Sequence, residues 1–113
     1  MLVVIRTYYG KGAKKLFGLL EHHQAEVQSL MCAVNGLVSY TLARDRRGGF
    51  SVTVCRHKRG INQSVKAARG FIAKYAPAMS LAAMQISEGK VITHIKNHDA
   101  GRARHSLERA IQF

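Results

Sequence analysis

The chain has 113 residues, a formal net charge of +12, 47% hydrophobic residues and two cysteines. This length indicates one domain with a modest core, and the hydrophobic fraction is typical of globular proteins rather than disordered ones. No apolar run approaches the roughly 18 residues of a membrane-spanning helix, and the N-terminus lacks a signal-peptide pattern. Cys32 and Cys55 form no CxxC pair or disulfide framework, so we expect a cytoplasmic protein without a membrane partner.

The first half of the chain changes from a strand pattern to a helix pattern. Leu2–Tyr9 is rich in β-branched and aromatic residues and predicts a strand. Arg6 lies between apolar neighbours on one face of it, and because burial of an unpaired charge is costly we expect that face not to pack under helices. After a Gly-Lys-Gly break, residues 13–34 have apolar residues at helical spacing and predict one amphipathic helix of about six turns.

Two further strands with a short loop follow. Leu37–Arg44 and Phe50–His57 both alternate large apolar with small or polar residues, and Asp45–Gly49 between them contains two glycines, as hairpin loops do. We expect the large residues of both strands to pack under the helices, while the small residues line the opposite face. The large residues are Val38, Tyr40, Leu42, Phe50, Val52 and Val54.

The last part of the chain predicts a second helix and more strand. The helix begins after Gly60 and ends before Pro77. Residues 83–87 and 91–95 predict the final strand material, divided by a turn at Glu88-Gly89. The element order is then βαββαβ, an α+β, ferredoxin-like domain over residues 1–96. The basic tail, residues 97–113, has weak helical spacing and predicts a short peripheral helix or a frayed end.

A single sheet with helices on one side leaves its other face exposed. Here we expect that face to carry Val4, Tyr8, Thr41, Thr53 and Cys55. A second copy can pack its sheet against such a face, or nucleic acid can lie on it. The latter needs stacking aromatic residues on the central strands, which we do not expect on this face.

Three segments resemble a known family. Val3–Tyr9, Asn35–Leu42 and Gly49–Cys55, with a downstream Ile-Ser-Glu-Gly-Lys-Val, are similar to the dimeric α+β barrel superfamily and to its antibiotic biosynthesis monooxygenase-like group. The resemblance implies a homodimer with a cavity between sheet and helices in each protomer. Relatives include cofactor-free monooxygenases and haem-degrading enzymes. This chain lacks tryptophan and an Asn-Trp-His set, so we expect no cofactor.

Arg6 and Tyr8 share a predicted strand face, and His57 ends the neighbouring strand. With Thr41, Thr53 and Cys55 on the same face, they are our candidate ligand-binding residues. Arginine and tyrosine could orient a phenolate or a carboxylate, and histidine could act as a general base. The alternative is an Arg6 ion pair at a surface or dimer interface and an exposed His57. The histidines are not spaced as metal ligands, so we expect no metal.

Two functions remain open from the sequence. One is the binding or oxidation of a small aromatic or hydrophobic compound in the cavity of a homodimer. The other is a non-catalytic binding or regulatory module for an anionic ligand or nucleic acid, which the charge of +12 favours. Nothing in the sequence decides whether the protein is an enzyme.

Overall fold

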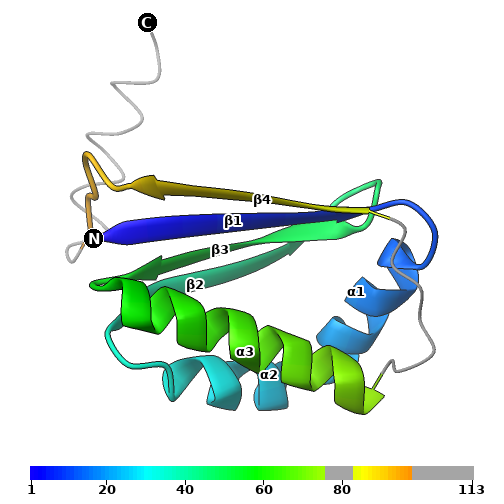
Figure 1. Cartoon of the computed structure of the whole chain (residues 1–113). Helices are drawn as coiled ribbons and strands as arrows, with labels where there is room; N and C mark the ends of the chain where they lie inside the picture. The colour runs from blue at the N-terminus through cyan, green and yellow to red at the C-terminus, as the bar shows by residue number, and fades with distance from the viewer. Residues whose placement is uncertain (76–82, 98–113) are drawn as a thin grey trace, which may run out of the picture.

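The computed structural model describes residues 1–75 and 83–97, which form one antiparallel sheet with helices on one side (Figure 1). The sheet has the strand order β2-β3-β1-β4. This is the predicted ferredoxin-like α+β arrangement, in which each helical crossover joins two strands that flank a third. The elements in chain order are β1 (Leu2–Tyr9), α1 (Ala13–His22), α2 (Gln24–Cys32), β2 (Leu37–Arg44), β3 (Gly49–Cys55), α3 (Lys58–Tyr75) and β4 (Ala83–Lys90).

The single helix predicted over residues 13–34 is wrong, because the helix breaks at His23. This residue leaves helical geometry, with φ of −108° and ψ of 34°, and its ring stacks on Tyr75 with centroids 4.1 Å apart. The break lets the two halves cover different surfaces: α1 contacts β1 and β3, while α2 contacts β2 and α3. A straight helix of six turns would not follow both surfaces.

The predicted turn at Glu88-Gly89 is also wrong. All eight residues of β4 pair with β1, from Tyr9 opposite Ala83 to Leu2 opposite Lys90. Full-length pairing satisfies the backbone groups on that side of β1, which a turn would leave unpaired. The predicted strand at 91–95 is not formed, although the Val91 amide donates to the Met1 carbonyl at 3.0 Å. Residues 98–113, where the tail helix was predicted, lie outside the described residues.

The predicted face assignments hold for Tyr40 and Leu42 of β2 and are reversed for β1 and β3. At the start of β2, an irregularity between Leu37 and Ser39 packs Leu37 against the core in place of the predicted Val38. Tyr40 and Leu42 face the helices as expected, but the register places Thr53 and Ser51 opposite them, so these two small residues also face the helices. Phe50, Val52 and Val54 therefore lie on the outer face, and the face of β1 that carries Arg6 is buried under the helices. The buried inward-facing side chains of β1 and β3 are those of Val4, Arg6, Tyr8, Ser51, Thr53 and Cys55.

The β2–β3 hairpin holds this register. The Asp45 carboxylate accepts hydrogen bonds from the backbone amides of Arg47 and Gly48, at 2.9 and 3.0 Å. Gly49 follows immediately, and the Phe17 ring lies directly against its backbone, where any Cβ would overlap the ring. A side chain is therefore excluded at the point where α1 packs on the hairpin.

The core consists of two apolar clusters beneath the helices. One contains Val4 with residues of α2 and α3, and the other contains Tyr8 with residues of α1. Arg6 lies on β1 between Val4 and Tyr8, and thus between the clusters. No helix within residues 1–75 and 83–97 has the length and apolar character needed to cross a membrane.

Candidate functional site

Arg6 is the most unusual residue of the interior. Its side chain is only 3% exposed, and its Nε has no hydrogen-bond partner within the described structure. Buried arginines normally pair with carboxylates, because an isolated buried charge is costly. The structure thus holds a buried cation whose bonding capacity is not fully used.

The four described carboxylates are engaged elsewhere. Glu21 pairs with Arg44 at 3.4 Å, Glu26 with Lys74 at 3.4 Å, and Glu88 with Lys58. The fourth, Asp45, accepts the amides of the hairpin loop. Within the described part of the chain, therefore, no carboxylate neutralises Arg6.

Two tyrosines flank the guanidinium group. Burial raises the pKa of Tyr8 above its ordinary value, although the charge of Arg6 and a hydrogen bond with it act in the opposite direction. Burial likewise raises the pKa of Tyr40, which the charge of Arg6 also opposes. Both hydroxyl groups are consequently protonated at neutral pH and can donate hydrogen bonds to an anion beside Arg6.

These three side chains line a partly open cavity of about 40 Å³ between the sheet and the helices. At about 10–15 Å³ per water, it has room for a few waters or one small polar group. Ser51 is the other polar residue of the wall, and the remainder is apolar. The apolar lining residues are Leu16, Leu20, Val27, Leu30, Met31, Leu42, Ala67, Ala68, Phe71 and Ile72.

A wider groove of about 420 Å³ continues outward from this cavity, between the α1–α2 helices and β2. The groove and the cavity share Leu20, Val27, Tyr40 and Leu42, so they form one continuous path. Two glutamines and the Glu21–Arg44 ion pair line its outer part. The path is thus apolar in the middle, cationic at its inner end and polar at its mouth.

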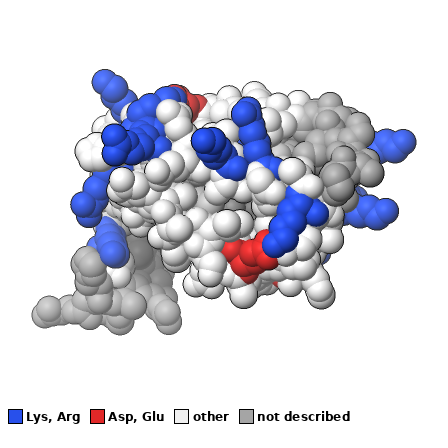
Figure 2. All heavy atoms as spheres, turned by 60° about the horizontal axis from the view of Figure 1, so that its bottom comes forward, with Lys and Arg blue, Asp and Glu red and all other residues white. Residues whose placement is uncertain are grey.

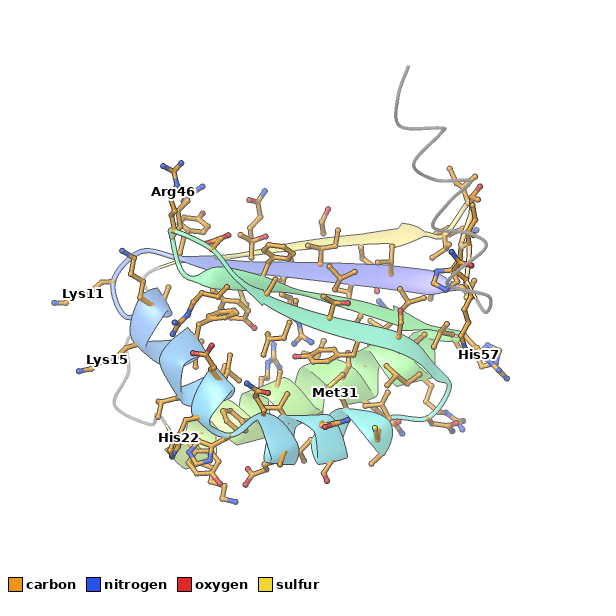
Figure 3. All side chains as sticks on the ribbon, turned by 180° about the vertical axis from the view of Figure 1, so that it is seen from behind. Lys11, Lys15, His22, Met31, Arg46 and His57 are labelled. Carbon is orange, nitrogen blue, oxygen red and sulfur yellow. The ribbon has the colours of Figure 1, made fainter. Side chains whose placement is uncertain are left out.

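The predicted site residues are divided by the fold. Arg6 and Tyr8 line the cavity, while Thr53 and Cys55 are fully buried on the same face but outside its lining. Thr41 is exposed on the opposite face, since it pairs with Val52. His57 is exposed beyond the end of β3 and projects away from the space between sheet and helices (Figure 3).

Sequence reasoning missed Tyr40 and Ser51 as lining residues. The sequence predicts Tyr40 on the helix-facing side of the sheet and Arg6 on the other side. It therefore did not bring these two residues together in one site. Ser51 gives no signal of its own, because alternating serine and threonine residues on a strand also suit a solvent-exposed face.

The lining residues favour binding over proton transfer. No His, Asp or Glu lines the cavity among the described residues, and both tyrosines have raised pKa values. The described residues beside Arg6 therefore include no group that accepts a proton near neutral pH. Residues 1–75 and 83–97 also bring together no set of three potential metal ligands.

No family model matches this sequence, and no curated protein matches it either. Solved structures do share its fold. A structure of MhuD with two manganese protoporphyrin IX groups per active site is 16% identical, with a TM-score of 0.61, covering 86% of this chain and 100% of that one. A monooxygenase from Streptomyces coelicolor in complex with nanaomycin D is 15% identical, with a TM-score of 0.53, covering 85% and 90%. A dimeric ferredoxin-like protein of unknown function from Thermobifida fusca is 16% identical, with a TM-score of 0.56, covering 80% and 90%.

These similarities define the chain as a protein of the ferredoxin-like α+β fold. The proteins that share it include a monooxygenase and a putative antibiotic biosynthesis monooxygenase, at 15% and 14% identity, so the fold that the sequence resemblance implies is confirmed. A porphyrin does not fit the site of this chain. Neither the cavity nor the groove is lined by a described His or Cys, two common axial ligands of haem iron.

Proposed function

We propose that the protein binds a small aromatic or hydrophobic compound that carries one acidic group, either a carboxylate or a phenolate. The observation that carries this proposal is the buried Arg6 guanidinium, whose Nε lacks a described partner, at the inner end of an apolar path. A bound anion would supply the missing charge and accept the unused donor.

The dimensions support a ligand placed with its acidic group inside. The cavity of about 40 Å³ accommodates the acidic group beside Arg6, Tyr8 and Tyr40. The groove of about 420 Å³ accommodates an apolar body against Leu20, Val27 and other shared residues, and falls in the usual range of about 300–1,000 Å³ for ligand sites. Hydrogen bonds to a charged group contribute about 1.5–3 kcal/mol, or roughly 10- to 150-fold in affinity.

Binding is the better supported activity. Oxidation of a neutral phenol would first require removal of its proton, and the described cavity lacks a residue suited to that step. Arg6 can stabilise an anion that forms without such a residue, so oxidation would be restricted to compounds acidic enough to ionise near neutral pH.

We further propose that the functional form is a homodimer in which two sheets pack face to face. The outer face carries Phe50, Val52 and Val3, which are half-buried, together with Ile5, which is 38% exposed, while Val54 on the same face is buried beside the segment after β4. Apolar residues on a sheet face that no described helix covers indicate an interaction surface. The dimeric ferredoxin-like protein from Thermobifida fusca, with the same fold, supports this assembly.

The binding proposal is tested with matched pairs of ligands. A fluorescent anionic dye, anilinonaphthalene sulfonate, reports occupation of the groove, and naphthoate competes against its neutral amide. We expect naphthoate to bind at least about tenfold more tightly than the amide, and Arg6→Met to abolish this preference. Equal affinity for acid and amide, or an unchanged preference in Arg6→Met, would contradict the proposal. Oxygen consumption measured in the same samples shows whether binding leads to oxidation.

The dimer proposal has its own test. Val52→Glu places a charge at the centre of the outer face, on a side chain that does not point toward the cavity. Light scattering after gel filtration should give a dimer for the natural sequence and a monomer for the variant. A natural chain that stays monomeric at tens of micromolar would refute the assembly without affecting the ligand proposal.

A further inference from the structure

The exposed face of α3 carries a row of cationic and amide side chains. Arg59, Asn62, Gln63, Lys66 and Arg69 recur at intervals of three and four residues, so they lie along one side of the helix, and all five are exposed. They line an open groove of about 670 Å³ along the helix. We refer to these five residues as the α3 strip.

The charges of the strip are not neutralised within the described structure. The three ion pairs among residues 1–75 and 83–97 involve Arg44, Lys58 and Lys74, and none involves a residue of the strip. The whole of α3 contains five basic residues and no acidic one. Figure 2, which views the molecule with the helical side brought forward, shows far more Lys and Arg than Asp and Glu on this surface.

This distribution of charge does not stabilise the helix. Lys58 and Arg59 occupy the first turn of α3, where the helix dipole favours acidic residues. Surface helices commonly gain stability from Glu–Lys pairs four residues apart, and α3 has none. A charge pattern that opposes helix stability but forms a continuous strip indicates a surface that meets an anionic partner.

We propose that the α3 strip binds the phosphate backbone of double-stranded nucleic acid. At 1.5 Å per residue, Arg59 and Arg69 are separated by about 15 Å along the helix, with Lys66 between them, which spans four to five nucleotide steps of about 3.4 Å. The two amide side chains add hydrogen-bond donors suited to phosphate and sugar oxygens. The strip contains no aromatic residue to stack on an unpaired base, which favours a duplex over a single strand.

The Gln63 side chain also joins the strip to the rest of the fold. Its Oε1 accepts a hydrogen bond from the Asn35 amide at 2.8 Å, so the side-chain NH₂ group remains as a donor. The strip is therefore anchored to the turn between α2 and β2. This surface is separate from the cavity, and the proposal does not depend on the ligand proposed for Arg6.

The test compares two variants that each remove three positive charges. In the first, Arg59, Lys66 and Arg69 are changed to Gln. In the control, Lys11, just before α1, and Lys14 and Lys15, in its first turn, are changed to Gln; Lys11 and Lys15 project from one end of the molecule in Figure 3. Binding of a fluorescent duplex DNA of about 20 base pairs is followed by anisotropy across a series of salt concentrations.

Each lost phosphate contact should weaken binding roughly 8-fold at about 0.1 M salt and lower the salt slope by about 0.9. We therefore expect the strip variant to lose roughly 500-fold, while the control loses much less. Equal losses in both variants would mean that net charge alone attracts DNA, and would overturn the proposal. Tighter binding to a single strand of equal length, or to phosphatidylserine vesicles, would overturn it as well.

Discussion

Replacement of Arg6 by Met should remove ligand binding without weakening the fold. Methionine has a similar length and no charge, so it can fill the same space between the two core clusters. For an ordinary buried residue, loss of function and loss of stability occur together. Their separation at Arg6 would show that the charge is retained for binding.

The expected magnitude follows from the contacts of Arg6. A buried donor without a partner costs about 1–3 kcal/mol, and the Nε of Arg6 is such a donor within the described residues. Loss of the favourable interaction between the guanidinium and the Tyr8 hydroxyl offsets part of this gain, by about 1 kcal/mol. The free energy of unfolding should therefore be unchanged or rise by up to about 2 kcal/mol, which corresponds to roughly 4–8 °C in Tm per kcal/mol.

Urea denaturation followed by circular dichroism, at one fixed protein concentration, measures this change. Val4→Ala serves as the control, because Val4 is fully buried on the same strand face and should cost roughly 2 kcal/mol. If Arg6→Met lowers the free energy of unfolding by as much as Val4→Ala, Arg6 is satisfied by the fold and the argument fails. Absorbance at high pH gives a second readout: the pKa of Tyr8 and Tyr40 should rise further once the nearby positive charge is removed.

Two further predictions concern stability. Gly49→Ala should destabilise the fold by about 1–3 kcal/mol, because the new Cβ would overlap the Phe17 ring. Gly70→Ala has open space around the new methyl group and should stabilise α3 by about 0.5–1 kcal/mol. Similar urea midpoints for the two variants would contradict this packing. A hydrogen bond donated by Tyr75 lowers the pKa of Glu26 below its ordinary value. The stability gained from this bond is fully present above the ordinary pKa of the carboxyl group, and it is lost as the pH falls through the lower pKa of the folded state. Glu26→Gln should therefore show a smaller loss of stability than the natural chain between about pH 5 and pH 3, and parallel pH curves for the two proteins would refute the assignment.

The positions of the elements could be read from the sequence because they depend on local chemistry. Leu2–Tyr9 and Leu37–Arg44 form strands with the predicted bounds, since β-branched and aromatic residues favour extended backbone. The loop between β2 and β3 turns where an aspartate and two glycines allow it. The order of these elements was sufficient to predict the ferredoxin-like fold.

Which residues face the helices was decided only by tertiary structure. β3 is a central strand, and either of its two alternating sets of residues could pack under the helices. Alternation alone therefore does not determine which set faces inward. Large residues on β1 and β2, such as Tyr8 and Tyr40, occupy the space under the helices and leave room only for small ones on β3. Ser51 and Thr53 therefore turn inward, and Val52 turns outward.

The candidate site follows from the same cause. Charged residues are rarely buried, and this rule is sound on average. It placed Arg6 on the wrong face because it considers stability alone, whereas we propose that Arg6 is buried for ligand binding. The break at His23 and the full-length pairing of β4 likewise depend on distant partners, Tyr75 and β1, which a local pattern does not contain. The sequence by itself determined the elements and their order. Only packing between distant segments decided that Arg6 would be buried in the cavity beneath the apolar groove.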